Sequence, residues 1–106
     1  PDTAYITNIN RVDILAKPLS NGDIALSFIN LSEMETTDEH SLDVSRIISY
    51  IGHKMVDADK FENATSYIIK DLWTGETRTS SSREFSVKAI APCDNVTLRI
   101  TPVKSN

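Results

Sequence analysis

Asp71 and Trp73 are the residues whose types and spacing best suggest a chemical role, the binding or cleavage of a sugar. An aspartate can attack a glycosidic bond or protonate it, and a neighbouring indole can stack on a sugar ring. Glycoside cleavage normally needs two carboxylates that face each other across one sugar, and fifteen Asp and Glu residues supply pairs without specifying one. We therefore expect Asp71 to end a strand and Trp73 to pack at the turn that follows.

Nucleophilic and metal chemistry have weaker candidates. A nucleophilic Cys93 needs a histidine base, and nothing in the spacing brings His40 or His53 to it. We expect Cys93 to be a buried or half-buried structural thiol, and a single cysteine excludes an internal disulfide. Asp57-Ala58-Asp59 lacks the glycine and the terminal glutamate of a calcium loop, and we expect the acidic segment around Glu35 to be solvated. No metal or cofactor is predicted.

Aromatic residues and glycosylation sequons are the remaining candidates. A sugar platform could draw on four aromatic residues: Tyr5, Tyr50, Tyr67 and Trp73. We expect Tyr67 and Tyr50 to face the core, which leaves Trp73 and Tyr5. Asn-x-Ser/Thr tripeptides, which are common by chance, occur at Asn30, Asn63 and Asn95. Taken alone, these residues indicate no more than a soluble β-sandwich.

Charge and composition exclude several classes of partner. The chain has 11 Lys and Arg residues and 15 Asp and Glu residues, so its net charge is −4. This charge disfavours binding to the phosphate backbone of a nucleic acid. We therefore expect no nucleic-acid partner, and no apolar run is long enough to cross a bilayer. Three glycines are too few for a phosphate-cradling loop. The 106 residues are 40% hydrophobic, as expected for one domain with one core.

The elements that position these residues follow a hydrophobic period of two, which is typical of half-buried strands. Six runs show it: 12–17, 24–29, 41–45, 66–70, 84–89 and 95–101. Asn21-Gly22 predicts a hairpin with a type I′ turn between the first two runs. Gly75 and Pro92 interrupt the later runs. The pattern predicts an all-β fold, an antiparallel β-sandwich (Greek-key or meander) of about six to eight strands.

Three segments do not fit this pattern. Ser32 to His40 carries several acidic residues and is predicted to be an exposed loop. In Arg46 to Gly52, Ile47, Ile48 and Ile51 share one face of a helical turn, so a short helical insertion is possible near residues 46–52, and a longer strand is the alternative. The polar segment 79–82 is predicted to be a loop.

Motifs in a fixed order resemble one known family. A strand ends in Lys17-Pro18-Leu19 and leads through a glycine-containing turn to an apolar strand that closes on Asn30. Lys70 to Gly75 reads Lys-Asp-Leu-Trp-Thr-Gly, and Ala91-Pro92 precedes a final strand over Leu98–Pro102. From Arg11 to Val103 the chain resembles the C-terminal β-sandwich of melibiase-type α-galactosidases and α-N-acetylgalactosaminidases, glycoside hydrolases of the family 27 type. Each motif alone is weak, and their shared order makes the resemblance specific.

The resemblance implies a domain without catalytic residues. In that family two aspartates of a preceding (β/α)₈ barrel cleave the sugar with retention, and no position of this chain matches their motifs. The residues carried over belong to the scaffold: Pro18, Asn21, Gly22, Asp71, Leu72 and Trp73. Two departures are visible, because Cys93 stands where relatives often carry histidine and the segment 46–63 is longer than in compact members.

The predicted protein is residues 1–106 as a single C-terminal domain of a longer enzyme, since the chain begins at Pro1 without a signal-peptide pattern. The resemblance implies that it packs on the catalytic barrel of the same polypeptide, which would remove terminal α-linked galactose, and that the full-length enzyme forms a homodimer. Trp73 and the cluster of Ile47, Ile48 and Ile51 are candidate contacts, with membership of the domain's own core as the alternative. A carbohydrate-binding module and a structural immunoglobulin-like module are the rival functions.

Overall fold

The computed structural model describes residues 4–9, 12–34 and 39–104, with residues 4–9 by their backbone only. In these residues eight strands, two α-helices and one 3₁₀-helix follow in this order: β1 (Ala4–Ile9), β2 (Val12–Pro18), β3 (Ile24–Asn30), β4 (His40–Asp43), α1 (Val44–Ile51), η1 (Gly52–Lys54), α2 (Ala58–Glu62), β5 (Ser66–Asp71), β6 (Thr77–Ser80), β7 (Glu84–Val87) and β8 (Asn95–Val103). None of the helices in these ranges is long and apolar enough to cross a membrane.

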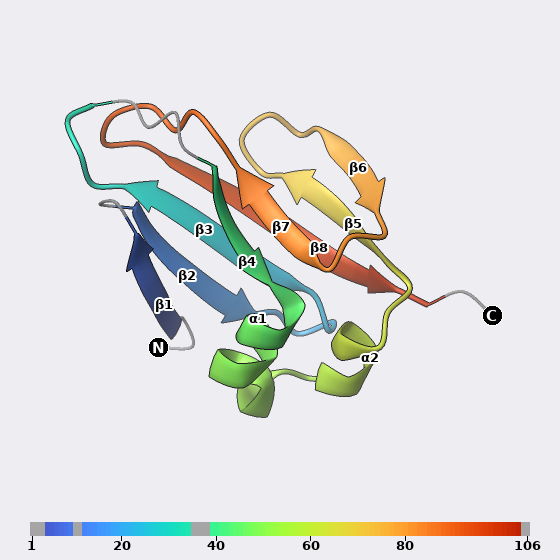
Figure 1. Ribbon diagram of the computed structural model, residues 1–106. Coiled ribbons are helices and arrows are strands. Elements are labelled where there is room, and N and C mark those ends of the chain that lie inside the picture. Colours follow the sequence, from blue (N-terminus) through green and yellow to red (C-terminus); the bar gives the residue numbers. More distant parts are fainter. Residues whose placement is uncertain (1–3, 10–11, 35–38, 105–106) are drawn as a thin grey trace.

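The strands form a large and a small sheet that pack against each other (Figure 1). The large sheet has the order β1-β2-β3-β8-β5-β6, and the small sheet pairs β4 with β7. Every pairing is antiparallel. Because the last strand inserts between β3 and β5, the topology is not a simple meander. The predicted all-β sandwich is confirmed.

The hairpin of β2 and β3 forms where the sequence predicts it, but with another turn. The Leu19 N–H donates to the Asp23 carbonyl at 2.9 Å, and the Gly22 N–H donates to the Leu19 carbonyl at 3.3 Å. Gly22 has a φ of 92°, whereas Asn21 does not have a positive φ. A type I turn followed by a glycine bulge has this geometry, so the type I′ prediction is wrong. Asn21 instead accepts the Asp23 N–H at 3.1 Å through its side chain.

The core lies between the inner face of the large sheet and the layer formed by β4, β7 and the helices. The alternating positions of the predicted strands are buried there: Val12, Ile14, Ala16, Ile24, Leu26, Phe28, Tyr67, Ile69, Phe85, Leu98 and Ile100. Ile47 and Ile51 of α1 are fully buried in the same cluster, and Ile48 packs against it. Ile47 and Ile51 therefore belong to the domain's own core, and Ile48 lies partly buried at its edge.

The helical insertion is larger than predicted. Asp43 accepts the Arg46 N–H at 2.7 Å and starts α1, which runs for eight residues rather than one turn. Gly52 does not end the helix in the left-handed region, because its φ is −54° and the chain continues into η1. Asp57 accepts the Lys60 N–H at 3.0 Å and starts α2, which was not predicted. The capping aspartates satisfy backbone groups that a helix leaves free at its first turn.

Two strands and one loop boundary differ from the sequence-based expectation. β1 and β6 have no counterpart among the six predicted runs, and β6 covers part of the segment predicted to be a loop. The predicted acidic loop is exposed at Glu33 and Met34, but His40 is buried and begins β4. Glu35 lies outside the described residues.

Candidate functional site

The turn between β5 and β6 holds an indole on a hydrogen-bonded support. The Asp71 Oδ1 atom accepts the backbone N–H of Trp73 at 2.8 Å and of Thr74 at 3.1 Å. The Gly75 N–H donates to the Asp71 carbonyl at 2.8 Å, and Gly75 adopts a φ of 79°. Only glycine takes this left-handed conformation without strain. We refer to Asp71–Gly75 as the Trp73 corner.

The Trp73 corner exposes the two apolar side chains that it carries. Leu72 is 50% exposed and Trp73 is 91% exposed. Asp71 ends β5 as predicted, but the expectation that Trp73 packs at its turn is wrong. The turn is closed by the Asp71 carboxylate and backbone groups, so the indole has no part in closing it. The Leu72 N–H donates to the Thr97 carbonyl at 2.9 Å, which ties the corner to β8.

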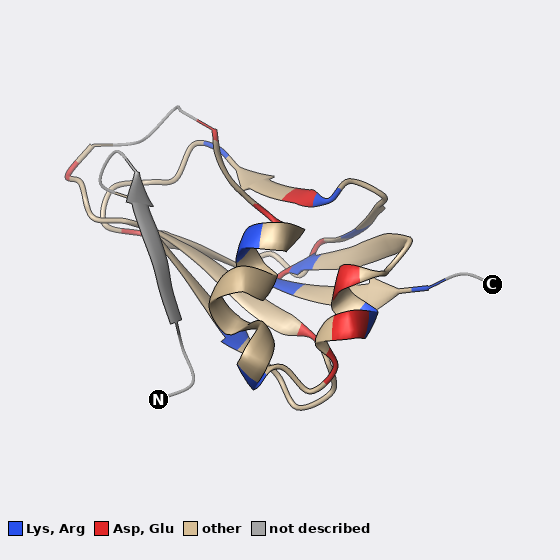
Figure 2. Cartoon of the chain, turned by 60° about the horizontal axis from the view of Figure 1, so that its bottom comes forward, with Lys and Arg blue, Asp and Glu red and all other residues tan. Residues whose placement is uncertain are grey.

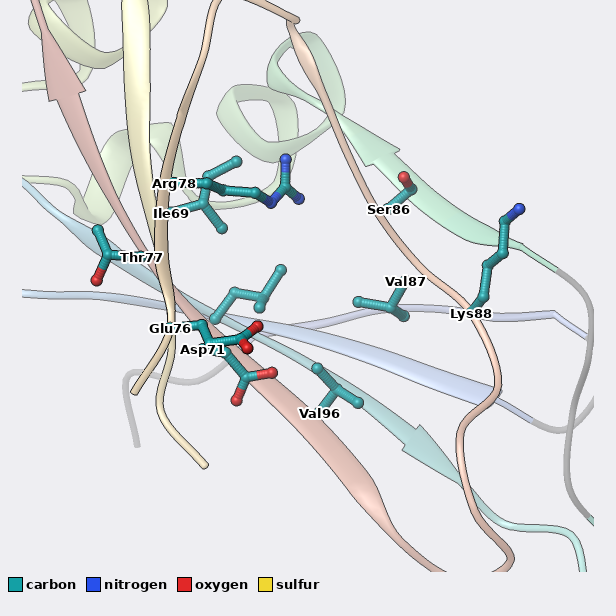
Figure 3. A pocket seen from close by; sticks show the side chains of 10 residues that line it. Ile69, Asp71, Glu76, Thr77, Arg78, Ser86, Val87, Lys88 and Val96 are labelled. Atoms are coloured by element: carbon teal, nitrogen blue, oxygen red, sulfur yellow. The ribbon is translucent and has the colours of Figure 1, made fainter. Parts of the chain in front are cut away.

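A cleft opens beside this corner, between β6 and β7 (Figure 3). Its volume is about 470 Å³. Ile69, Val96 and Leu98 line it with aliphatic groups. Ile69 and Leu98 are otherwise buried, so the cleft reaches down to the hydrophobic core of the sandwich.

Charged side chains of both signs line the same cleft. Asp71 and Glu76 lie next to each other at the corner, while Arg78 comes from β6 and Lys88 follows β7 (Figure 3). Figure 2 shows that acidic and basic residues are interspersed along the described chain. Because the two carboxylates share one side of the opening, they do not face each other across a sugar as a glycosidase pair does.

The cysteine and the histidines are not brought together. Cys93 is exposed, has a φ of 55° and donates through its thiol to the Ser32 carbonyl at 3.6 Å, so the expected buried thiol is wrong. His40 is 2% exposed within β4, and His53 is exposed in η1. No three His, Cys, Asp or Glu side chains among the described residues are placed to hold a metal ion.

The candidate aromatic platform separates into different environments. Tyr67 is fully buried, as predicted, and its hydroxyl donates to the Phe61 carbonyl at 2.6 Å. Tyr50 is 42% exposed on α1, with the Arg46 guanidinium 6.0 Å from its ring centre, so the prediction that it faces the core is wrong. The side chain of Tyr5 lies outside the described residues.

Asn30 is the scaffold residue whose role the sequence reading missed. It is 1% exposed, and its Nδ2 atom donates to the carbonyls of Met34, Ile90 and Ala91 at 2.8, 3.1 and 3.2 Å. One amide thus joins the segment after β3 to the segment before β8. The sequence signal is an Asn that closes an apolar strand, and it marks the position without indicating these hydrogen bonds. Asn63 and Asn95 are exposed.

The scaffold residues carried over from the resemblance lie at two turns. Pro18 ends β2 opposite Ile24, and Asn21 and Gly22 form the adjacent hairpin loop. Asp71, Leu72 and Trp73 form the corner after β5. The structure therefore defines a class of protein, an antiparallel β-sandwich whose hairpins are fixed by polar side chains.

The sequence assigns this class to a family. The model of the alpha galactosidase C-terminal beta sandwich domain matches residues 10–100. The chain belongs to that family, as its ordered motifs predicted. No curated protein matches the sequence significantly.

Solved structures share the fold at low sequence identity. The GH27 β-L-arabinopyranosidase of Geobacillus stearothermophilus superposes with a TM-score of 0.71 and 12% identity, covering 98% of this chain and 20% of its own. α-Galactosidase I of Mortierella vinacea gives 0.71 and 12%, covering 98% of this chain and 24% of its own. An Arthrobacter globiformis isomaltodextranase gives 0.58 and 23%, covering 87% and 13%. The chain thus spans about a fifth of the first of these proteins.

Proposed function

We propose that this chain is the non-catalytic C-terminal domain of an α-galactosidase and that it packs on the catalytic barrel of the same polypeptide and stabilises it. Membership of the family supports the domain type. The fungal α-galactosidase that shares the fold is about four times longer than the part that superposes, since 24% of it is covered. The remaining length leaves room for a catalytic domain.

The exposed Trp73 is the observation that carries this proposal. An indole that is 91% exposed beside a half-exposed Leu72 is an unpartnered apolar surface in the described part of the chain. The hydrogen bonds of the Trp73 corner fix its backbone, so little entropy is lost when a second domain covers it. Buried tryptophans rank among the residues that contribute most to interfaces, about 2 kcal/mol or more each.

A paired assay tests the enzymatic part of the proposal. Hydrolysis of a chromogenic α-galactoside is measured with this chain alone and with the full-length polypeptide that contains it. We expect activity in the full-length polypeptide and none in the chain alone. Activity of the chain alone would overturn the non-catalytic assignment. Absence of hydrolysis in both samples would overturn the α-galactosidase assignment.

A substitution tests the packing on the barrel. Trp73→Ala should shorten the thermal lifetime of the full-length enzyme while leaving the unfolding of the isolated chain nearly unchanged, because the indole makes its contact with the other domain. Tyr50→Ala is the matched control, since it removes another partly exposed aromatic ring, from α1. If both variants of the full-length enzyme behave like the parent, the Trp73 corner is not the contact.

The outer face of the large sheet is the surface that we propose for a homodimer of the full-length enzyme. Helices and the small sheet cover the other face (Figure 1). On β3 the outward residues Ala25, Ser27 and Ile29 are only partly buried, and the Ser27 and Thr97 hydroxyls lie 3.0 Å apart at the centre of this face. These partly buried side chains belong to the central strands of the large sheet and leave its outer face open to a second copy. Sedimentation of the full-length polypeptide as a monomer would contradict this.

A carbohydrate-binding module is the second candidate, and the same exposed indole favours it. Trp73 is the single tryptophan of the chain, so its fluorescence reports on a sugar that stacks there. We expect no change in emission when the isolated chain is titrated with millimolar galactosides. A saturable change would favour the binding module over packing on the barrel.

A further inference from the structure

We propose that the cleft between β6 and β7 binds a neutral saccharide of one or two rings, at a site separate from the exposed face of Trp73. Its volume of about 470 Å³ lies within the range of small-molecule sites, roughly 300–1,000 Å³. The inference does not depend on the proposed packing against a barrel.

The floor of the cleft suits the apolar face of a sugar ring. Val96 and Leu98 stand on the inner face of β8, and Ile69 stands beside them on β5. Val96 is the partly exposed residue of this floor, whereas Ile69 and Leu98 are 2% and 5% exposed and lie beneath it. The floor is open at Val96 because β7 ends at Val87 and the chain then turns away, with Ala89 at a φ of 54°. The small sheet therefore stops short of covering this part of the large sheet, and Val87 and Val96 both point into the opening (Figure 3).

The charges around the floor favour a neutral ligand. Asp71 and Glu76 supply two negative charges, and Arg78 and Lys88 supply two positive charges. An anion or a cation would meet as much repulsion as attraction from this balanced set. A sugar fits it better, because its hydroxyls donate to carboxylates and accept from guanidinium and ammonium groups.

The polar groups are available for such a ligand. Of the Asp71 carboxylate, only Oδ1 takes part in the hydrogen bonds that close the Trp73 corner. The ion pair between Arg99 and Asp23 does not involve Glu76, Arg78 or Lys88. Arg78 lies opposite Ile69 in the ladder of β5 and β6, so its side chain stands on the inner face and extends over the floor (Figure 3).

Nuclear magnetic resonance of the isotope-labelled chain, titrated with the disaccharide melibiose, tests the site. We expect saturable shifts at the amides of Glu76, Arg78, Val87 and Lys88 at millimolar sugar, and none at α1. Sodium phosphate at equal concentration should not shift the resonances of these amides. Shifts that are confined to Trp73, that appear with phosphate instead, or that are absent at tens of millimolar melibiose would each overturn the proposal.

Substitutions assign the binding to the cleft. Arg78→Ala and Glu76→Ala should each weaken melibiose binding about tenfold, the loss that one charge-assisted hydrogen bond accounts for. Lys54→Ala removes an exposed charge from η1, outside the cleft, and should leave binding unchanged. If Arg78→Ala or Glu76→Ala loses the spectrum of the folded chain, Lys88→Ala replaces it as the cleft variant, because Lys88 is also exposed. It should weaken melibiose binding in the same way. Equal weakening by Lys54→Ala would overturn the assignment.

Discussion

The two ends of strand β5 place aromatic residues in opposite environments. Near its start, Tyr67 is fully buried, with the Phe61 and Phe85 rings each 5.2 Å away. Just after its end, Trp73 is 91% exposed. Both residues are aromatic and lie on or next to the same strand, so their different burial depends on which elements cover each end of β5. The comparison separates a part of the molecule that stabilises the fold from a part that is available for contact.

The helical insertion is what covers the start of β5. Phe61 comes from α2, and its ring contacts both Tyr67 and Phe85, from the large and the small sheet. At the other end the small sheet stops at Val87, and the cleft and the Trp73 corner are left open.

Phe61→Ala is expected to cause the largest loss of stability among these variants. Truncating a fully buried phenylalanine should lower the free energy of unfolding by about 3–5 kcal/mol, because a cavity remains among the aromatic rings. Trp73→Ala in the same isolated chain should change it by less than about 0.5 kcal/mol. Urea unfolding followed by circular dichroism measures both. Similar losses for the two variants would mean that the indole contributes to the domain's own stability.

Gly75→Ala tests whether the Trp73 corner is as rigid as its hydrogen bonds indicate. No heavy atom lies within 4 Å of an added Cβ, so the cost comes from the φ of 79° alone. We expect a loss of about 1–2 kcal/mol in the free energy of unfolding. Gly75→Asn should cost less, because Asn enters the left-handed region more readily. An alanine variant as stable as the parent would show that the corner relaxes easily.

The strands of the large sheet that carry the core were more predictable from sequence than α2, which covers the start of β5 and was not predicted. Burial at alternate positions of β2, β3, β5 and β8 follows from a hydrophobic period, and Ile47 and Ile51 from a helical one. The Asp71 turn could be placed because an aspartate followed by a glycine is typical of a turn. β6 escaped prediction, since its exposed polar residues carry no period and it forms by pairing with β5.

The cleft and the exposed thiol of Cys93 depend on contacts between distant segments, which the sequence alone does not reveal. Glu76, Arg78 and Lys88 are ordinary surface residues until the ends of two sheets place them around one opening. Cys93 follows Pro92 in a turn, and its exposure depends on the backbone pairing between its own N–H and the Ser32 carbonyl, 3.1 Å apart. Both arise from contacts between segments far apart in the chain.

Tyr67→Phe tests the buried start of β5 with a smaller expected loss than Phe61→Ala or Gly75→Ala. Burial raises the pKa of Tyr67 above its ordinary value of 10.0, and the nearby Arg83 guanidinium offsets only part of this. At neutral pH the substitution should cost about 1 kcal/mol, since the bond from the hydroxyl to the Phe61 carbonyl is lost. Above about pH 10 the unfolded chain releases this proton more readily than the folded chain, so the parent loses stability as the pH rises toward the folded pKa. The phenylalanine variant lacks this proton, so urea unfolding across that range should show the difference between the two proteins shrinking. A constant difference would mean that burial does not suppress ionisation of this hydroxyl.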